Sequence, residues 1–556
     1  MKILRPAALF LAALLLTGKS DACTNFIVTR GASTDGSVMV TYAADSHQLY
    51  GALYQYRAPR RTYKPGTMLP IYEWDTGRWL GMIPQAEKTY STVGNMNEHQ
   101  LIIAESTFGG RSELADTTGV MDYGSLIYIA LQRARTAREA IRVIVDLANK
   151  YGYYSSGESF SIADPQEAWI MELIGKGCEI REGQNIRKGI VWVARRIPDG
   201  YVSGHANQAR IAQFPLDDPE NCLYAPDVIT FAREQGYFDG PDEDFSFADA
   251  YAPLDFSAMR ACEARVWSFF RRVAPDMDRY LDYALGYNAA NRMPLWVKPS
   301  DKISPKELFD CMRDHFEGTP MDMTQGVGAG GHKLPYRWRP MNFEVDGVNY
   351  LNERATATQQ TGFWFVAQAT GLPYPAGGVL WFGVDDAATS PLTPIFCATT
   401  EIPWCLDQRN GHMTEYSESS MFWLCNRVTN FAYLRYDLIS ADIRKVIDAW
   451  ENEQLARVAE LAREVAEETG RNPKKGLERL TDYSVRTAQS LFDRWSELDK
   501  YLLVKYIDGN VKREDSNGFL DNGEGRNIPA SPLFPGYGEV WKRAVAADDD
   551  GILRAR

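Results

Sequence analysis

The feature that most constrains the fold is a cysteine, Cys23, placed directly after a segment that has the pattern of a secretory signal peptide. That segment has a positively charged start, an apolar run over residues 7–17 and a small, polar close over residues 18–22. The apolar run is shorter than the ~20 residues that a membrane-spanning helix needs. We therefore expect residues 1–22 to be removed on export. The remaining chain should be a periplasmic or secreted protein, without stable membrane insertion, that folds with Cys23 as its first residue.

The composition of the 556-residue chain fits a globular protein with one large core and an appended domain, since 45% of its residues are apolar and 24% are charged. Its net charge is −13 and no run of Lys and Arg forms a basic stripe, so nucleic acid is not an expected partner. The six histidines form no metal-ligand pair at the usual spacing, so we expect no metal. Gly326, Gly328 and Gly331 spell a dinucleotide-binding pattern, but Pro335 follows instead of a helix, so we expect no cofactor.

Short β-rich segments alternate with segments of helical periodicity after Cys23, which itself lies at the start of a predicted β-hairpin. A helix is expected over residues 125–151, where apolar residues recur on one face. This alternation favours a layered α+β structure over a β-sandwich or a helical bundle. Strands are expected over residues 24–30, 37–42, 101–104, 159–163, 168–173, 189–194 and 378–384.

The pattern changes near residue 440, where a long helix is expected to run to Gly470 and to stop before Pro473. A second helical stretch follows over residues 477–506. We therefore expect a helical extension over residues 438–508 without chemistry of its own. The remaining residues, 509–556, contain several glycines and prolines and are expected to be an irregular tail.

A cysteine next to a signal cleavage site has two chemical interpretations. Cleavage after Ala22 would free the α-amine of Cys23, whose pKa of about 7.7 to 8 suits a general base for its own thiol. Alternatively, acylation of Cys23 would block that amine and anchor a lipoprotein without catalytic activity. Ser20 stands where a lipid-attachment signal usually has an apolar residue, which favours the nucleophile.

Several motifs carry a resemblance to a known family. The chain resembles the C69 family of cysteine dipeptidases from Cys23 to about Tyr436, with the motifs in order. This resemblance implies a four-layer αββα sandwich of the N-terminal-nucleophile hydrolases over residues 23–437. It also implies hydrolysis of the peptide bond of dipeptides or short peptides through an acyl-enzyme intermediate. The matching motifs are residues 22–28, 32–37, 94–99, 162–169, 191–194, 205–211, 353–354 and 381–386.

The resemblance assigns roles to four residues. Cys23 matches the nucleophile, and Asp45 falls where the family has an aspartate that orients the amine and the thiol. Asn207 falls where related acylases donate a side-chain hydrogen bond to the oxyanion. Arg265 roughly matches their active-site arginine. From the residues alone, the less favoured alternatives are that Asp45 is a carboxylate at a strand end and that Asn207 lies in a turn.

Three further residues bear on the site. Many relatives have Arg or Lys where this chain has Tyr42, so that charged support for the thiolate is absent. Glu105 and Ser106 follow a predicted strand at the edge of the expected cleft and could bind substrate, although they could also be solvated residues at a strand end. The expected partner is a small peptide, and the chain could form a homo-oligomer. An N-acyl amidase of the penicillin or bile-salt acylase type remains the alternative enzyme, because it shares this machinery.

Overall fold

The computed structural model describes most of the chain that follows the predicted signal segment. Residues 1–22, which contain that segment, lie outside the described residues, as does Gly470, the predicted helix end. Among the helices of the described part, none combines the length and the apolar character needed to cross a membrane. The described residues are 23–46, 48–54, 57, 62–469, 472–524 and 526–555.

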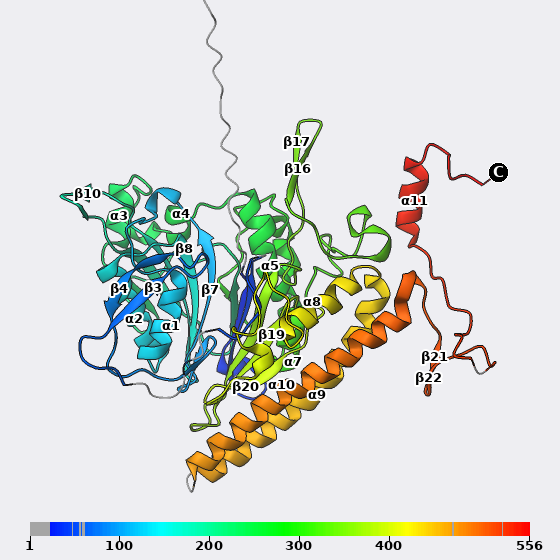
Figure 1. The fold of residues 1–556 in the computed structure, drawn as a ribbon. Helices are drawn as coiled ribbons and strands as arrows, with labels where there is room; N and C mark the ends of the chain where they lie inside the picture. The colour runs from blue at the N-terminus through cyan, green and yellow to red at the C-terminus, as the bar shows by residue number, and fades with distance from the viewer. Residues whose placement is uncertain are drawn as a thin grey trace, which may run out of the picture.

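Two seven-stranded antiparallel sheets form the centre of the molecule (Figure 1). They face each other, since β1 and β2 of the first sheet contact β7 of the second. The first sheet has the order β15 (Trp296–Val297), β13 (Val202–His205), β1 (Asn25–Val28), β2 (Val38–Asp45), β18 (Thr361–Ala369), β19 (Gly378–Val384) and β20 (Thr393–Phe396). The second has the order β14 (Cys222–Tyr224), β12 (Ile190–Arg196), β9 (Ala168–Gly175), β8 (Gly157–Ala163), β7 (Ile102–Gly109), β6 (Met96–Asn97) and β5 (Thr92–Val93).

Helices cover the outer faces of both sheets. On the second sheet, α1 (Tyr123–Arg133) contacts β5 to β7, and α2 (Ala137–Tyr151) contacts β8, β9 and β12. On the first sheet, α5 (Ala264–Val273) contacts β13, and α7 (Pro305–Cys311) contacts β18 (Figure 1). Because both faces of each sheet are buried, strands such as β1 and β19 carry apolar side chains on both faces. The predicted α+β class is confirmed.

Strand β1 shows how the sequence supplies two cores at once. Ile27 belongs to the core between the sheets, whereas its neighbours Phe26 and Val28 belong to the core under the helices of the first sheet. Successive side chains of a strand point to opposite faces, so one apolar segment serves both cores. The position of Cys23 is thereby fixed, since it immediately precedes this central strand.

One predicted helix is divided in two. We expected a single helix over residues 125–151, but α1 ends at Arg133 and α2 begins at Ala137. Thr136 is the reason, because its side chain accepts a hydrogen bond from the backbone N–H of Glu139 and so caps α2.

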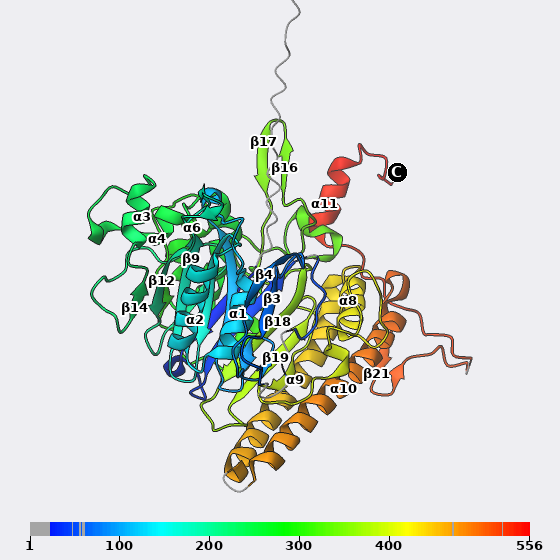
Figure 2. The same cartoon turned by 60° about the vertical axis from the view of Figure 1, so that its left-hand side comes forward.

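The two long C-terminal helices are confirmed. Helix α8 (Met421–Ala432) leads into α9 (Tyr436–Thr469), which lies beside α10 (Pro473–Tyr506), and α10 packs on β20 (Figure 2). The tail after Gly509 is more ordered than expected. It forms a small hairpin of β21 (Glu514–Asp515) and β22 (Gly518–Phe519), and a helix, α11 (Glu539–Asp548), in which Glu539 pairs with Arg543 one turn later.

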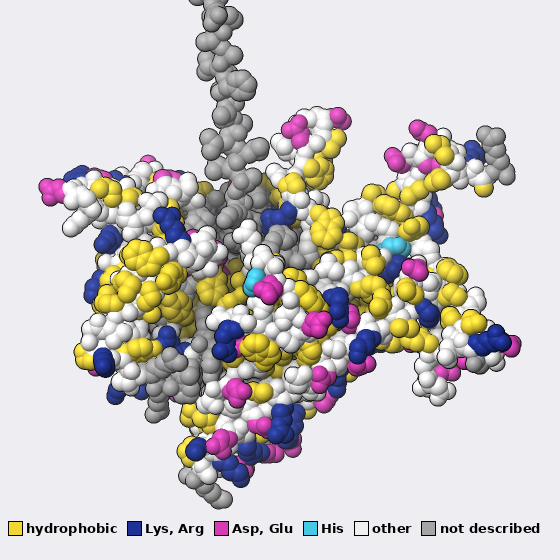
Figure 3. All heavy atoms as spheres, in the orientation of Figure 1, with side chains coloured by type: hydrophobic (Ala, Val, Ile, Leu, Met, Phe, Trp, Pro, Cys, Tyr) yellow, Lys and Arg dark blue, Asp and Glu magenta, His cyan; other side chains and the backbone are white. Residues whose placement is uncertain are grey.

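Several short strands and helices lie outside the two main sheets and their covering helices. The pair β3 (Met68–Tyr72) and β4 (Trp79–Pro84) buries Ile71 and Ile83 and leaves an apolar outer face, over which hydrophobic side chains gather in Figure 3. The exposed large side chains there are Met68, Tyr72, Trp79 and Met82. The remaining elements are β10 (Ile180–Arg181), β11 (Gln184–Asn185), α3 (Val228–Glu234), α4 (Phe247–Tyr251), α6 (Leu281–Ala284), β16 (Asn342–Val345) and β17 (Val348–Leu351).

Candidate active site

The thiol of Cys23 lies between the two sheets, beside an acidic side chain. Cys23 is only 6% exposed, and its Sγ is 3.2 Å from Oε1 of Glu105 and 3.5 Å from the hydroxyl of Tyr42. The Tyr42 hydroxyl also donates a hydrogen bond to Glu105. Burial, and then the charges of Glu105 and Asp45, raise the pKa of the Cys23 thiol well above its usual value. The thiol is therefore protonated in this environment and needs a base before it can act as a nucleophile.

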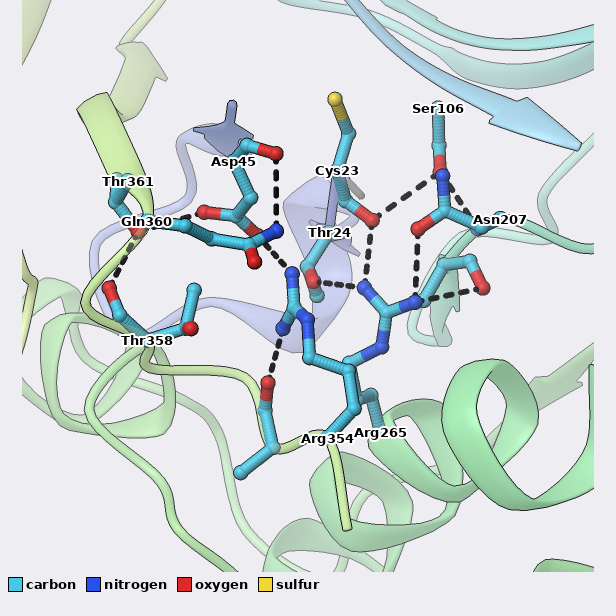
Figure 4. Close-up of polar contacts among 12 residues, drawn as sticks. Cys23, Thr24, Asp45, Ser106, Asn207, Arg265, Arg354, Thr358, Gln360 and Thr361 are labelled. Carbon is cyan, nitrogen blue, oxygen red and sulfur yellow. Dashed lines mark hydrogen bonds and ion pairs between the residues drawn. The ribbon is translucent and has the colours of Figure 1, made fainter. Parts of the chain in front are cut away.

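The backbone of Cys23 is held by two side chains (Figure 4). Its carbonyl oxygen accepts hydrogen bonds from the Ser106 hydroxyl, at 3.2 Å, and from Nη1 of Arg265, at 2.8 Å. The same Nη1 also donates to Oγ1 of Thr24, at 2.7 Å. These contacts fix the two residues that precede β1, so the direction of the Cys23 side chain is set by the fold.

Asn207 lies directly beside this group. It has a positive φ of 57°, a conformation that asparagine tolerates better than most residues. Its backbone N–H donates to the Ser106 hydroxyl at 2.7 Å, and its Nδ2 donates to the carbonyl of Thr107 at 2.7 Å. Nη2 of Arg265 donates to its Oδ1 at 2.8 Å. Because Arg265 can only donate, it fixes the orientation of the Asn207 side-chain amide, with Oδ1 toward Arg265 and the Nδ2 donors on the other side.

Asp45 forms an ion pair behind Cys23. As the last residue of β2, it is paired with Arg354, and it accepts a hydrogen bond from the Thr361 hydroxyl at 2.6 Å. Burial raises its pKa, and Arg354 opposes that rise. Burial, and then Arg354, lower the pKa of Arg265 to about 10, so Arg265 stays charged at neutral pH. Two arginines and one carboxylate thus make the region behind the thiol net positive.

All the residues predicted for the site lie in this region. Cys23 contacts Glu105, Ser106 and Arg265. Ser106 and Arg265 also contact Asn207. Asp45, at the end of β2, lies on the other side of Cys23 in Figure 4. Tyr42 occupies the position beside the thiol that the sequence suggested for it. Sequence reasoning gave no role to Thr24, Arg354 or Thr361. Arg354 could have been found, since it belongs to one of the matching motifs.

Within the described ranges, one group of carboxylates could approach a metal ion, and it comprises Asp310, Asp448 and Glu451. These acids already have cationic partners. Lys306 lies 2.7 Å from Asp310 and 2.9 Å from Asp448, and Glu451 pairs with Arg313. We interpret the group as an ion-pair network between α7 and α9.

Comparison with known proteins finds relatives that carry the name dipeptidase. A "Probable dipeptidase" of Salmonella dublin is 24% identical over 443 residues, covering 75% of this chain and 91% of the relative. A "Probable dipeptidase" of Latilactobacillus sakei is 20% identical over 460 residues, covering 78% and 87%. A "Probable dipeptidase B" of Streptococcus pyogenes serotype M1 is 20% identical over 528 residues, covering 89% and 95%.

A family model gives the assignment. The model described as "Peptidase family C69" matches residues 22–449, a range that contains every residue of the site described above. This match confirms the family predicted from the sequence motifs, and with it an enzyme that hydrolyses peptide bonds. The chain therefore belongs to peptidase family C69.

Proposed function

We propose that the protein is an exported cysteine dipeptidase in which Cys23, freed from residues 1–22, is the N-terminal nucleophile. The observation that carries this proposal is the position of Cys23, whose carbonyl is held by Ser106 and Arg265 while its thiol faces Glu105. The names of the relatives support the dipeptidase activity. The two facing sheets with helices outside support the N-terminal-nucleophile type of sandwich.

In this proposal the base is the α-amine of Cys23 itself. The buried thiol does not ionise readily beside Glu105, so an adjacent amine with a pKa of about 7.7 to 8 provides what the nucleophile lacks. The amine takes the thiol proton while sulfur bonds to the scissile carbonyl carbon. It then returns that proton to the leaving nitrogen as the C–N bond breaks. Water, activated by the same amine, hydrolyses the resulting thioester.

The proposed role of Asn207 is to donate to the oxyanion of the tetrahedral intermediate, with Arg265 holding the amide in the required orientation. Asp45 and Arg354 are proposed to position the amine, because their ion pair lies at the end of β2, the strand that pairs with β1.

The test is a substrate panel on protein that begins at Cys23. Dipeptides should be hydrolysed and Cys23→Ala should hydrolyse none, whereas faster turnover of N-acyl amino acids would favour the N-acyl amidase. Mass spectrometry of the exported protein should show Cys23 as residue one with a free amine. A diacylglyceryl adduct on Cys23 would instead favour a lipid-anchored protein.

A further inference from the structure

A second buried carboxylate, Glu158, lies beside Glu105. Strand β8 pairs with β7 so that Glu158 is opposite Thr107, and Thr107 and Glu105 lie on the same face of β7. The Thr107 hydroxyl donates to Oε2 of Glu158 at 2.9 Å. Glu158 is 0% exposed and Glu105 is 1% exposed. The register thus brings two carboxyl groups together, and one of them, Glu105, contacts the Cys23 thiol.

Glu158 lacks a compensating charge within the described part of the chain. Its carboxyl group interacts with Glu105 and with the Thr107 hydroxyl, and none of the ion pairs among the described residues includes Glu158. Burial, and then the charge of Glu105, raise its pKa well above the usual value. Ionising two neighbouring buried carboxyl groups together costs much free energy unless a cation binds between them. Without a cation, one of the two keeps its proton.

Acidic groups also lead from this pair toward solvent. Asp75 is exposed, and it accepts a hydrogen bond from the Tyr123 hydroxyl at 2.7 Å. Burial, and then the charges of Glu105 and Asp75, raise the pKa of Tyr123, so this tyrosine lies near both the pair and the exposed acid. Tyr123 thus contacts an exposed acid and lies close to the buried Glu105.

The geometry of a dipeptide brings a cation to this place. The scissile carbonyl belongs to the first residue of the substrate, so its ammonium nitrogen is two bonds, or about 2.5 Å, from the carbon that sulfur attacks. Glu105 lies 3.2 Å from that sulfur. The substrate ammonium is therefore within reach of Glu105 and of Glu158 beside it, whereas an N-acyl substrate would present an uncharged group there.

We infer that Glu158, together with Glu105, forms the subsite for the free α-ammonium group of the substrate's first residue. This inference rests on the proposed dipeptidase function and adds the specificity-determining residue. It accounts for selection of peptides with a free N-terminus over N-acylated ones, because charge-assisted hydrogen bonds to two carboxylates are lost when the amine is absent.

The test compares L-alanyl-L-alanine with propionyl-L-alanine, which differs by lacking the amine. Glu158→Gln should lower kcat/KM for the dipeptide about 10- to 100-fold, mainly through KM, and should change the value for propionyl-alanine less than about 3-fold. The same selectivity should appear in calorimetric binding of both compounds to Cys23→Ala. Glu167→Gln is the control, since Glu167 lies at the β8–β9 turn and pairs with Arg138. This substitution should leave kcat/KM unchanged for both compounds.

An equal fall in kcat/KM for both compounds in Glu158→Gln would overturn the inference, because Glu158 would then act through the amine of Cys23 or through the fold. That outcome leaves dipeptide hydrolysis by the wild type intact. If the wild type instead turned over propionyl-alanine faster than the dipeptide, the proposed function and the inference would both fail. The two failures are therefore distinguishable.

Discussion

The Cys23 carbonyl oxygen accepts hydrogen bonds from Ser106 and Arg265, and the same two side chains also form hydrogen bonds with Asn207. At the scale of single residues, the nucleophile and the proposed oxyanion donor are therefore positioned by shared contacts. Arg265 is buried and charged, so its loss would disturb both groups at once. Asn207 offers the cleaner probe, because its amide can be removed while Arg265 keeps its bonds to Cys23 and Thr24.

We expect Asn207→Ala to lower kcat by about 10²- to 10³-fold with KM nearly unchanged, since the hydrogen bond to the oxyanion strengthens in the transition state. Steady-state kinetics on a dipeptide would measure this. Asn185→Ala serves as control, because Asn185 caps the β10–β11 hairpin and its loss should leave kcat unchanged. A rise in KM alone for Asn207→Ala would mean that Asn207 binds substrate and that backbone amides stabilise the oxyanion.

At the scale of elements, strand β9 of the second sheet holds the loop that carries Asn207. The carboxylate of Glu172 accepts backbone N–H bonds from Arg210, at 2.5 Å, and from Ile211, at 3.1 Å. This loop follows β13 of the first sheet. One buried side chain thus ties the two sheets together immediately beyond the proposed oxyanion donor.

Glu172 predicts a pH dependence of stability. Burial raises its pKa from the ordinary 4.5 to about 7, so the native state retains a proton that the unfolded state has already lost between these values. Its contribution to stability therefore falls as the pH rises from about 4.5 to 7. Glu172→Gln keeps an acceptor that does not titrate. Between pH 5 and pH 8 the free energy of unfolding of the wild type should fall by about 1–3 kcal/mol relative to this variant, as measured by denaturant unfolding. A difference that stays constant with pH would contradict this.

The strands and the main helices could be predicted from local patterns, because apolar runs and helical spacing are properties of neighbouring residues. The roles at Cys23 and Asn207 came from a resemblance. A motif singles out Arg354 as a candidate, but its pairing with Asp45 could not be predicted, since the two residues are 309 positions apart and only the folded chain brings them together. Glu158 was missed for the same reason. Its proximity to Glu105 depends on the register between β7 and β8, which the sequence does not display.

At the scale of the whole molecule, the long helices are joined to the first sheet by buried polar contacts as well as apolar ones. Arg313, just after α7, donates two hydrogen bonds to Glu451 of α9, at 2.6 and 3.1 Å, and both side chains are almost fully buried. The hydroxyl of Ser484 in α10 accepts the backbone N–H of Phe396 in β20. The helical extension is therefore part of the main core.

We expect Glu451→Ala to destabilise the protein by about 3–5 kcal/mol, because it leaves the charge of Arg313 buried and uncompensated. Unfolding in denaturant would measure the loss, while kcat/KM of the folded fraction should stay unchanged. Glu453→Ala is the matched control on the same helix, since its partner Arg494 is partly exposed and such pairs contribute less than about 1 kcal/mol. Equal effects of the two substitutions would show that the buried pair does not join α9 to the core.

The central claim is that Cys23 acts with its own α-amine as base, and adding one residue ahead of Cys23 tests this most directly. An alanine retained there turns the amine into an amide while the thiol and its neighbours remain. We predict that dipeptide turnover falls by about 10²- to 10⁴-fold relative to protein that begins at Cys23, the range for loss of a general base. An undiminished rate in the extended protein would contradict the account, because the amine could then play no part in the reaction.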